Sequence, residues 1–168
     1  MAYVFLLNWF VFTMAIGWCR HYKRALIFNI IATLSFAVYA YMIDQNVASA
    51  TFILAGTNSF IQLILPKSNS LKHKRLRNGF AVLIAIIACF YLFQRASELL
   101  LCLSFTVIRI CEAQQSPRIM KCGMATGMFL YAAFGVWEGL YMMTALKIVV
   151  MLTFLYKLYD ERRLGAVH

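Results

Sequence analysis

Residues 139–158 read GLYMMTALKIVVMLTFLYKL, and this stretch decides how the whole chain is interpreted. A helix of about 20 mostly apolar residues is long enough to span the ~30 Å hydrocarbon core of a bilayer. Lys147 interrupts the stretch near its midpoint. A cationic side chain at that depth costs roughly 2.5–3.5 kcal/mol, so we expect it to face protein or a water-filled cavity. The stretch therefore predicts a membrane protein with a polar interior.

The composition agrees with a bilayer as the solvent. The chain has 168 residues, of which 63% are hydrophobic and only 13% are charged. A soluble domain of this length carries about 25% charged residues. Sixteen Lys and Arg residues against six Asp and Glu give a formal charge of +10. Because the basic residues fall between apolar runs, they indicate membrane orientation rather than nucleic-acid binding.

Seven apolar stretches are predicted to span the membrane, at residues 2–19, 25–43, 47–65, 79–94, 97–111, 119–136 and 139–158. With the N-terminus outside, thirteen basic residues fall on the inner side, against Arg95 alone on the outer side. Such an asymmetry sets the orientation of membrane proteins, so the C-terminus is predicted to be cytoplasmic. The first stretch lacks a preceding basic region and is expected to remain as a span rather than be cleaved.

The spacing of spans and loops recurs along the chain, and it predicts two parallel repeats. Shifting the chain by 92 residues superposes Cys19 on Cys111 and Tyr39 on Tyr131, and it brings loop onto loop. One span separates the two triplets, so they would run in the same direction about an axis along the membrane normal. We therefore expect a 3+1+3 order. Residues 1–65 form the first bundle, 66–96 a basic loop with a linker helix, and 97–168 the second bundle and a short cytoplasmic tail.

The longest polar connection is PKSNSLKHKRLRN at residues 66–78. A basic segment between two spans is typical of a cytoplasmic loop that also contacts anionic lipid headgroups. The predicted partners are therefore the lipid bilayer and these headgroups, with no nucleic acid. The sequence leaves open whether the chain forms a homo-oligomer.

The order of the spans and two segments of the sequence resemble a known family. The 3+1+3 order resembles the SWEET and PQ-loop superfamily of small-molecule facilitators. The segments RALIFNIIATLSFAVYAYMIDQNVASATF and SPRIMKCGMATGMFLYAAFGVWEGLYMMTAL look like the YgjV-type bacterial inner-membrane proteins. The resemblance implies a SWEET-like bundle, a bacterial inner-membrane location and transport of a small solute. Unlike sugar facilitators, the chain has no proline within a predicted span, because Pro66 and Pro117 sit at cytoplasmic boundaries.

Lys147 is the leading candidate for a substrate-binding residue. Its partner is expected to be an anionic substrate, or Asn58, Thr57 and a backbone carbonyl. In the alternative interpretation, desolvation neutralises the amine or its stem carries it outward to the interface. Asn58 and Gln62 lie one turn apart and predict a hydrogen-bonding face near the midplane, although contacts between helices would use the same residues.

Two further residues complete the candidate set. Asn29 lies near the cytoplasmic end of the second span and either lines a path or packs as a polar residue. Arg109 lies near the cytoplasmic end of the fifth, where it can reach the interface or bind substrate. Glu112 is assigned to the following cytoplasmic turn, and Trp9 to the lipid-facing aromatic residues. Gly123 and Gly127 form a small-xxx-small pair that predicts a close helix contact.

Catalysis finds no support in the sequence. HExxH, GxSxG and glycine-rich phosphate-loop motifs are absent, and no Cys/His pair has metal-ligand spacing. We therefore predict neither an enzyme nor a cofactor or metal site. The function expected first is a small-solute transporter or facilitator, with a polar site for a small polar or anionic solute between the two bundles. The alternative is a non-transporting membrane protein that serves as an accessory subunit or scaffold.

Overall fold

A computed structural model describes residues 1–65, 70–93 and 95–165. Three short segments lie outside the described residues: 66–69, 94 and 166–168. They are the start of the predicted basic loop, the last residue of the predicted fourth span and the end of the predicted tail. Within the described ranges the chain forms seven α-helices and one short 3-10 helix: α1 (Ala2–Trp18), α2 (Tyr22–Met42), α3 (Asn46–Ile64), α4 (Leu71–Leu92), η1 (Ala96–Glu98), α5 (Leu99–Ala113), α6 (Pro117–Trp137) and α7 (Tyr141–Gly165).

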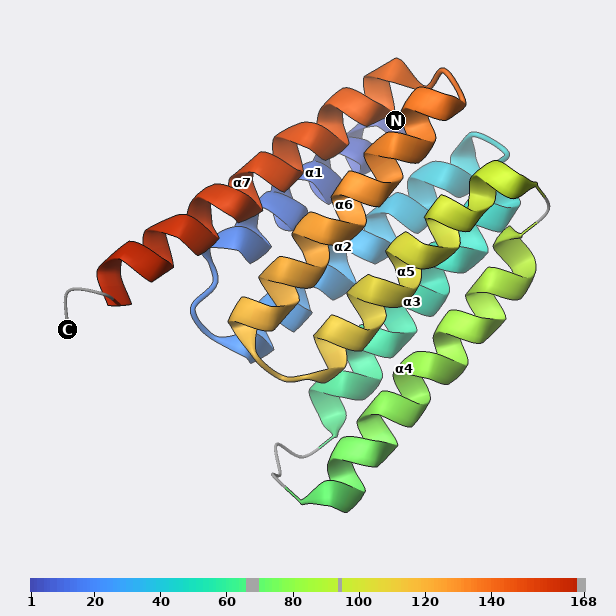
Figure 1. The fold of residues 1–168 in the computed structure, drawn as a ribbon. Coiled ribbons are helices and arrows are strands. Elements are labelled where there is room, and N and C mark those ends of the chain that lie inside the picture. Colours follow the sequence, from blue (N-terminus) through green and yellow to red (C-terminus); the bar gives the residue numbers. More distant parts are fainter. Residues whose placement is uncertain (66–69, 94, 166–168) are drawn as a thin grey trace.

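The helices form a bundle in which each one packs against its neighbours in the sequence. Successive helices run up and down, and α7 returns to pack against α1, while α3 also contacts α5 (Figure 1). Helix α4 lies at the edge of the bundle beside α3 and α5 (Figure 1). Short turns between apolar helices favour this antiparallel packing of neighbours.

Within the described residues, five helices are long and apolar enough to cross a bilayer: α2, α3, α4, α6 and α7. The helix α1 is apolar but has 17 residues, and α5 has 15. At 1.5 Å per residue α5 is about 22 Å long, which is shorter than the ~30 Å hydrocarbon core. Large apolar side chains remain exposed around the bundle, such as Phe90 at 84%. These are the features of a multi-pass membrane protein.

The fourth helix is longer than the sequence predicted. The residues assigned to the end of the basic loop, 71–78, form the first two turns of α4, so this helix has 22 residues rather than a short span beginning at residue 79. Leu, Lys and Arg all have high helix propensity, and a helix can continue past the membrane surface when its charged side chains reach water. Arg77 is buried in this extension, and its Nε donates to Ala113 O at 3.3 Å.

Four of the six boundaries of the first three helices recur 95 residues later in the last three. The start of α2 at Tyr22 corresponds to the start of α6 at Pro117, and the start of α3 at Asn46 to the start of α7 at Tyr141. The ends of α1 and α2 correspond in the same way to the ends of α5 and α6. The offset of 92 expected from residue identities is thus replaced by 95, a difference of nearly one helical turn.

The turns repeat with the same offset as the helices. Gln45 N donates to Ala40 O at 2.8 Å after α2, and Leu140 N donates to Gly135 O at 2.7 Å after α6. Each of these turns contains one residue with a positive φ, Asp44 at 59° and Gly139 at 71°. Such left-handed residues are common where a helix ends. The recurrence therefore extends to the hydrogen-bonding geometry of the turns.

The close contact predicted at Gly123 and Gly127 is confirmed between α6 and α5. A Cβ added to Gly123 would overlap Cβ and Sγ of Cys111, and one added to Gly127 would overlap Ile108. Small residues let two helix backbones approach in this way.

Replacing Gly123 with alanine is expected to destabilise the protein by about 1–3 kcal/mol, because the Cβ of Cys111 cannot move without its helix. Gly79→Ala is the matched control, since nothing lies within 4 Å of its added Cβ. The measurement is thermal unfolding of the purified protein in detergent. Equal melting temperatures for the two variants would contradict the close packing of α5 on α6.

Candidate functional site

A cavity of about 120 Å³ lies inside the bundle, and side chains from all seven helices line it. A buried water needs about 10–15 Å³, so the space takes several waters or one small solute. Most of the wall is apolar, with aromatic and methionine side chains. Lys147 and Arg109 are the charged residues in the lining, and no Asp or Glu of the described residues belongs to it.

Lys147 lies in a cage of aromatic rings. It is the seventh residue of α7, nearer one end of the helix than the predicted midpoint, and only 1% of it is exposed. Its Nζ lies 3.9 Å from the ring centroid of Trp9 and 4.2 Å from that of Tyr131. The rings of Phe36 and Phe52 follow at 5.4 and 5.9 Å. Four other helices thus surround one ammonium group.

The cage compensates only part of the cost of burying this charge. Removing an ammonium ion from water costs several kcal/mol even after the protein relaxes. A ring face within about 6 Å returns roughly 0.5–2 kcal/mol, and only two of the four rings are close. Among the described residues, no carboxylate and no hydrogen-bond acceptor pairs with Nζ. Lys147 therefore places an amine without a counterion beside an internal space.

A buried ion pair occupies the neighbouring part of the interior. Arg109 and Glu112 are three residues apart on α5, and their side chains meet with Arg109 NH1 2.6 Å from Glu112 Oε2. Arg109 NH1 also donates to Ala55 O of α3 at 2.9 Å. Glu112 is fully buried, and its backbone carbonyl accepts a hydrogen bond from Tyr22 of α2 at 2.5 Å. The pair therefore joins three helices.

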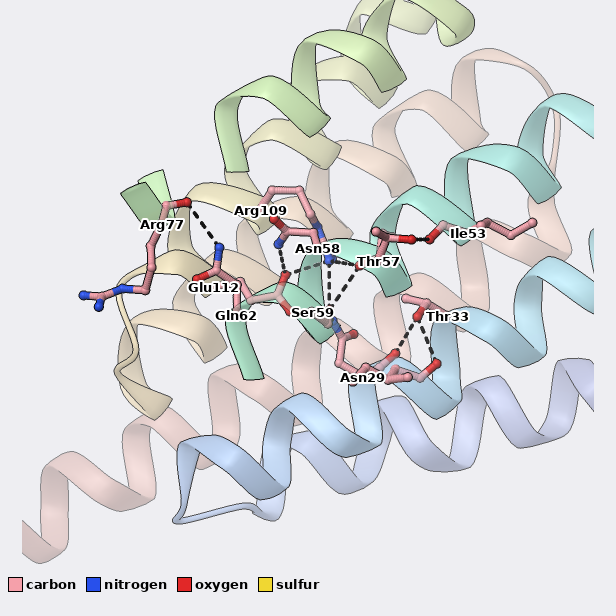
Figure 2. A network of polar contacts seen from close by, with 12 residues as sticks. Asn29, Thr33, Ile53, Thr57, Asn58, Ser59, Gln62, Arg77, Arg109 and Glu112 are labelled. Carbon is pink, nitrogen blue, oxygen red and sulfur yellow. Dashed lines mark hydrogen bonds and ion pairs between the residues drawn. The ribbon is translucent and has the colours of Figure 1, made fainter. Parts of the chain in front are cut away.

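Amide side chains complete this network (Figure 2). Asn58 Nδ2 donates to Glu112 Oε2 at 2.8 Å. Asn29 Nδ2 lies 3.2 Å from Glu112 Oε1 and 2.8 Å from the hydroxyl of Ser59. Both oxygens of the carboxylate thus accept hydrogen bonds, as a buried charge requires. Two atoms in the described network have no partner, Asn58 Oδ1 and Arg109 Nε.

The serine and threonine hydroxyls in the cavity wall already donate to their own helices or to a neighbouring helix. Thr13 donates to Trp9 O at 2.6 Å, Thr33 to Asn29 O at 2.7 Å, and Thr51 to Val47 O at 2.8 Å. Ser104 donates to Gly127 O across α5 and α6 at 2.7 Å. Among the described residues, the donors of this wall that remain for a solute are the Lys147 amine and the Tyr131 hydroxyl.

Residues of α1–α3 and of α5–α7 both line the cavity. Some lining residues are 95 positions apart, which is the offset at which helix boundaries recur, and both members of several such pairs contribute to the lining. Five pairs do so: Trp9 and Ser104, Thr13 and Ile108, Asn29 and Met124, Thr33 and Met128, and Phe52 and Lys147. Phe36 and Tyr131 are a sixth pair, since both rings face Lys147 Nζ.

The structure brings some predicted site residues together and separates others. Lys147, Asn29 and Arg109 line the cavity, and Asn58 lies behind them in the network around Glu112. Gln62 is buried, and its Nε2 donates to Arg77 O of α4 at 3.2 Å (Figure 2). It does not line the cavity.

The structure places Thr57 outside the cavity. Its side chain is exposed on α3 and donates to Ile53 O at 2.9 Å, so it contributes neither to the cavity nor to the network (Figure 2). Asn58 and Thr57 are likewise not the partners of Lys147, whose contacts are aromatic rings. Adjacent helix residues point in directions about 100° apart, which places Thr57 outside when Asn58 points inward.

Two residues that carry the site were assigned elsewhere from the sequence. Trp9 was expected to face lipid, but it is 2% exposed and forms the closest wall of the cage. Glu112 was placed in a cytoplasmic turn, but it lies within α5 and is fully buried. Its spacing of three residues from Arg109 is the signal that an ion pair on one helix face leaves in a sequence.

The chain matches no family model, no curated protein and no solved structure. The resemblance to YgjV-type and SWEET proteins therefore stays a prediction. A function for the chain has to be inferred from the cavity itself.

Proposed function

We propose that this chain is a small-solute transporter or facilitator of a bacterial inner membrane. The solute binds in the internal cavity, between one bundle formed by α1–α3 and a second formed by α5–α7, with α4 as the linker. The N-terminus is outside and the C-terminus is cytoplasmic. The observation that carries the proposal is the set of repeat-related pairs that line the cavity around a buried lysine.

Three features support a binding role for this space. Transporters built from internal repeats bind their substrates at the repeat interface, within the membrane. An ionisable residue inside a membrane bundle is expensive, and it usually marks a solute or ion path. The cavity also has an apolar wall with a few polar groups, which is the usual form of a small-molecule site.

Reconstitution with a mixture of solutes tests the proposal, because the transported compound need not be identified beforehand. Proteoliposomes are loaded with a defined mixture of small organic acids, amino acids and sugars, and efflux is followed by mass spectrometry. Liposomes without protein give the background. The proposal expects at least one component to leave faster through the protein. Equal efflux of every component, from protein whose folding has been verified, would favour the scaffold function instead.

Filling the cavity should abolish this efflux. Ala48 lines the cavity on α3, whereas Ala50 lies two residues on and is exposed. Ala48→Phe places a ring in the space of the solute, and efflux is expected to fall at least tenfold. Ala50→Phe adds the same ring outside and should keep the wild-type rate. Unchanged efflux through Ala48→Phe would show that solute does not pass through this cavity.

A further inference from the structure

We infer that the ligand of the cavity is a small organic monoanion, with one singly charged acidic headgroup paired with Lys147 and a short apolar body against the wall. This inference rests on the proposed function and specifies its substrate class. The sequence left neutral polar and anionic solutes equally open. Three properties of the cavity distinguish these two classes of solute: its charge, its hydrogen-bonding groups and its apolar wall.

The charge of the site favours one negative charge on the ligand. Arg109 is neutralised by Glu112 at 2.6 Å, and the same carboxylate is held by Asn58 at 2.8 Å. Lys147 has no such partner among the described residues, and its surroundings are aromatic rings. The cavity can therefore supply one positive charge to a bound anion, that of the Lys147 ammonium. A second negative charge on the ligand would be buried without a counterion, which is costly.

The hydrogen-bonding capacity argues against sugars and other polyols. A polyol needs several donors and acceptors around it, since each buried hydroxyl that loses its water must find a partner. The wall hydroxyls of Thr13, Thr33 and Thr51 donate to their own helices, and Ser104 donates to α6. Among the described lining residues, the amine of Lys147 and the hydroxyl of Tyr131 make no hydrogen bond within the protein. Both can donate to an anion, but they are too few for a polyol.

The wall also fits an apolar body. Phe105, Ile108, Met124 and Met128 line the cavity beside its basic residues. Methionine side chains are unbranched and adapt to the shape of an irregular ligand. A volume of about 120 Å³ limits that body to a few carbon atoms. The site therefore combines one positive charge with a short apolar surface.

A matched series of small molecules tests the inference on the purified full-length protein in detergent. Butyrate is the probe, butyramide its neutral counterpart of the same shape, succinate its divalent counterpart, and glucose the polyol. A ligand that binds only the folded protein raises its melting temperature. We expect butyrate to raise it in a dose-dependent way, with at least tenfold weaker binding of butyramide and succinate and no effect of glucose. Lys147→Gln should lose the butyrate response, and Lys157→Gln should keep it.

Two outcomes would overturn the inference. Stabilisation by glucose but not by butyrate would show that the ligand is a polyol. The transporter proposal would then still hold. A butyrate response retained in full by Lys147→Gln would show that the ammonium does not hold the headgroup.

Measuring the flux of ethanesulfonate tests transport independently of binding. This anion is suitable because it stays ionised and does not cross lipid as a neutral acid. Butyrate binding without ethanesulfonate flux would contradict transport while supporting the monoanion site. Faster ethanesulfonate flux through the wild type than through Lys147→Gln supports both.

Discussion

Replacing Lys147 with glutamine is expected to abolish solute binding and transport while the protein remains folded. The ammonium is the only charge in the cavity lining that lacks a carboxylate partner within the described residues. Its loss removes the group that attracts an anion. It also removes the cost of burying a cation, so the melting temperature should stay the same or rise. The measurement is efflux per folded protein in proteoliposomes, with an expected loss of at least 100-fold.

Lys157→Gln is the control for this experiment. Lys157 lies on the same helix and also contacts a ring, with its Nζ 3.4 Å from the centroid of Trp18. It does not line the cavity, and it pairs with Asp160 at 3.7 Å. Its replacement should leave transport within twofold of the wild type. Transport that survives in Lys147→Gln, or fails equally in both variants, would remove Lys147 from the mechanism.

The second large effect is expected at the buried ion pair. Replacing Glu112 with alanine leaves Arg109 as an unpaired charge among α2, α3 and α5 and removes an acceptor for Asn58. Breaking a buried pair from one side typically costs about 3–5 kcal/mol. We expect a large fall in the melting temperature in detergent and a loss of folded protein from the membrane. The effect should be on folding rather than on solute selectivity.

Two comparisons make this result specific. Asp160→Ala removes the acidic partner of the more exposed Lys157–Asp160 pair, and such pairs are worth about 0–1 kcal/mol. The double variant Arg109→Met with Glu112→Leu removes both charges and should be more stable than Glu112→Ala alone. A Glu112→Ala protein as stable as Asp160→Ala would contradict the buried network.

Hydropathy predicted the helices well because a transmembrane span is long and strongly apolar. Hydropathy predicted the position of charged residues less well, because a charged residue ends a predicted span and is therefore assigned to a turn. Glu112 and the residues around Arg77 were placed in loops for this reason, although α5 and α4 contain them. A charge can enter the helical bundle when its partners lie on other helices, and a single sequence does not show those partners.

The residue facing Lys147 could not be identified from the sequence either. Anions, amides and carbonyls are the partners that an ammonium group suggests, but the structure supplies the ring faces of Trp9 and Tyr131. Many aromatic residues of this chain do face outward, so residue type alone does not distinguish a cage from a lipid-facing surface. The rings that face Lys147 come from four other helices, and the spacing of residues within one helix does not predict such contacts.

The central claim is that water and solute reach the cavity between the two triplets. Labelling of an engineered cysteine tests it most directly, in a variant whose five native cysteines have been replaced. Ser104→Cys, within the cavity wall, should react in folded proteoliposomes with a membrane-impermeant, negatively charged thiosulfonate, and butyrate should slow the reaction. Phe90→Cys, exposed on the outer surface of α4, should not react because lipid covers it. A Ser104→Cys protein that stays unreactive from both sides would contradict the account.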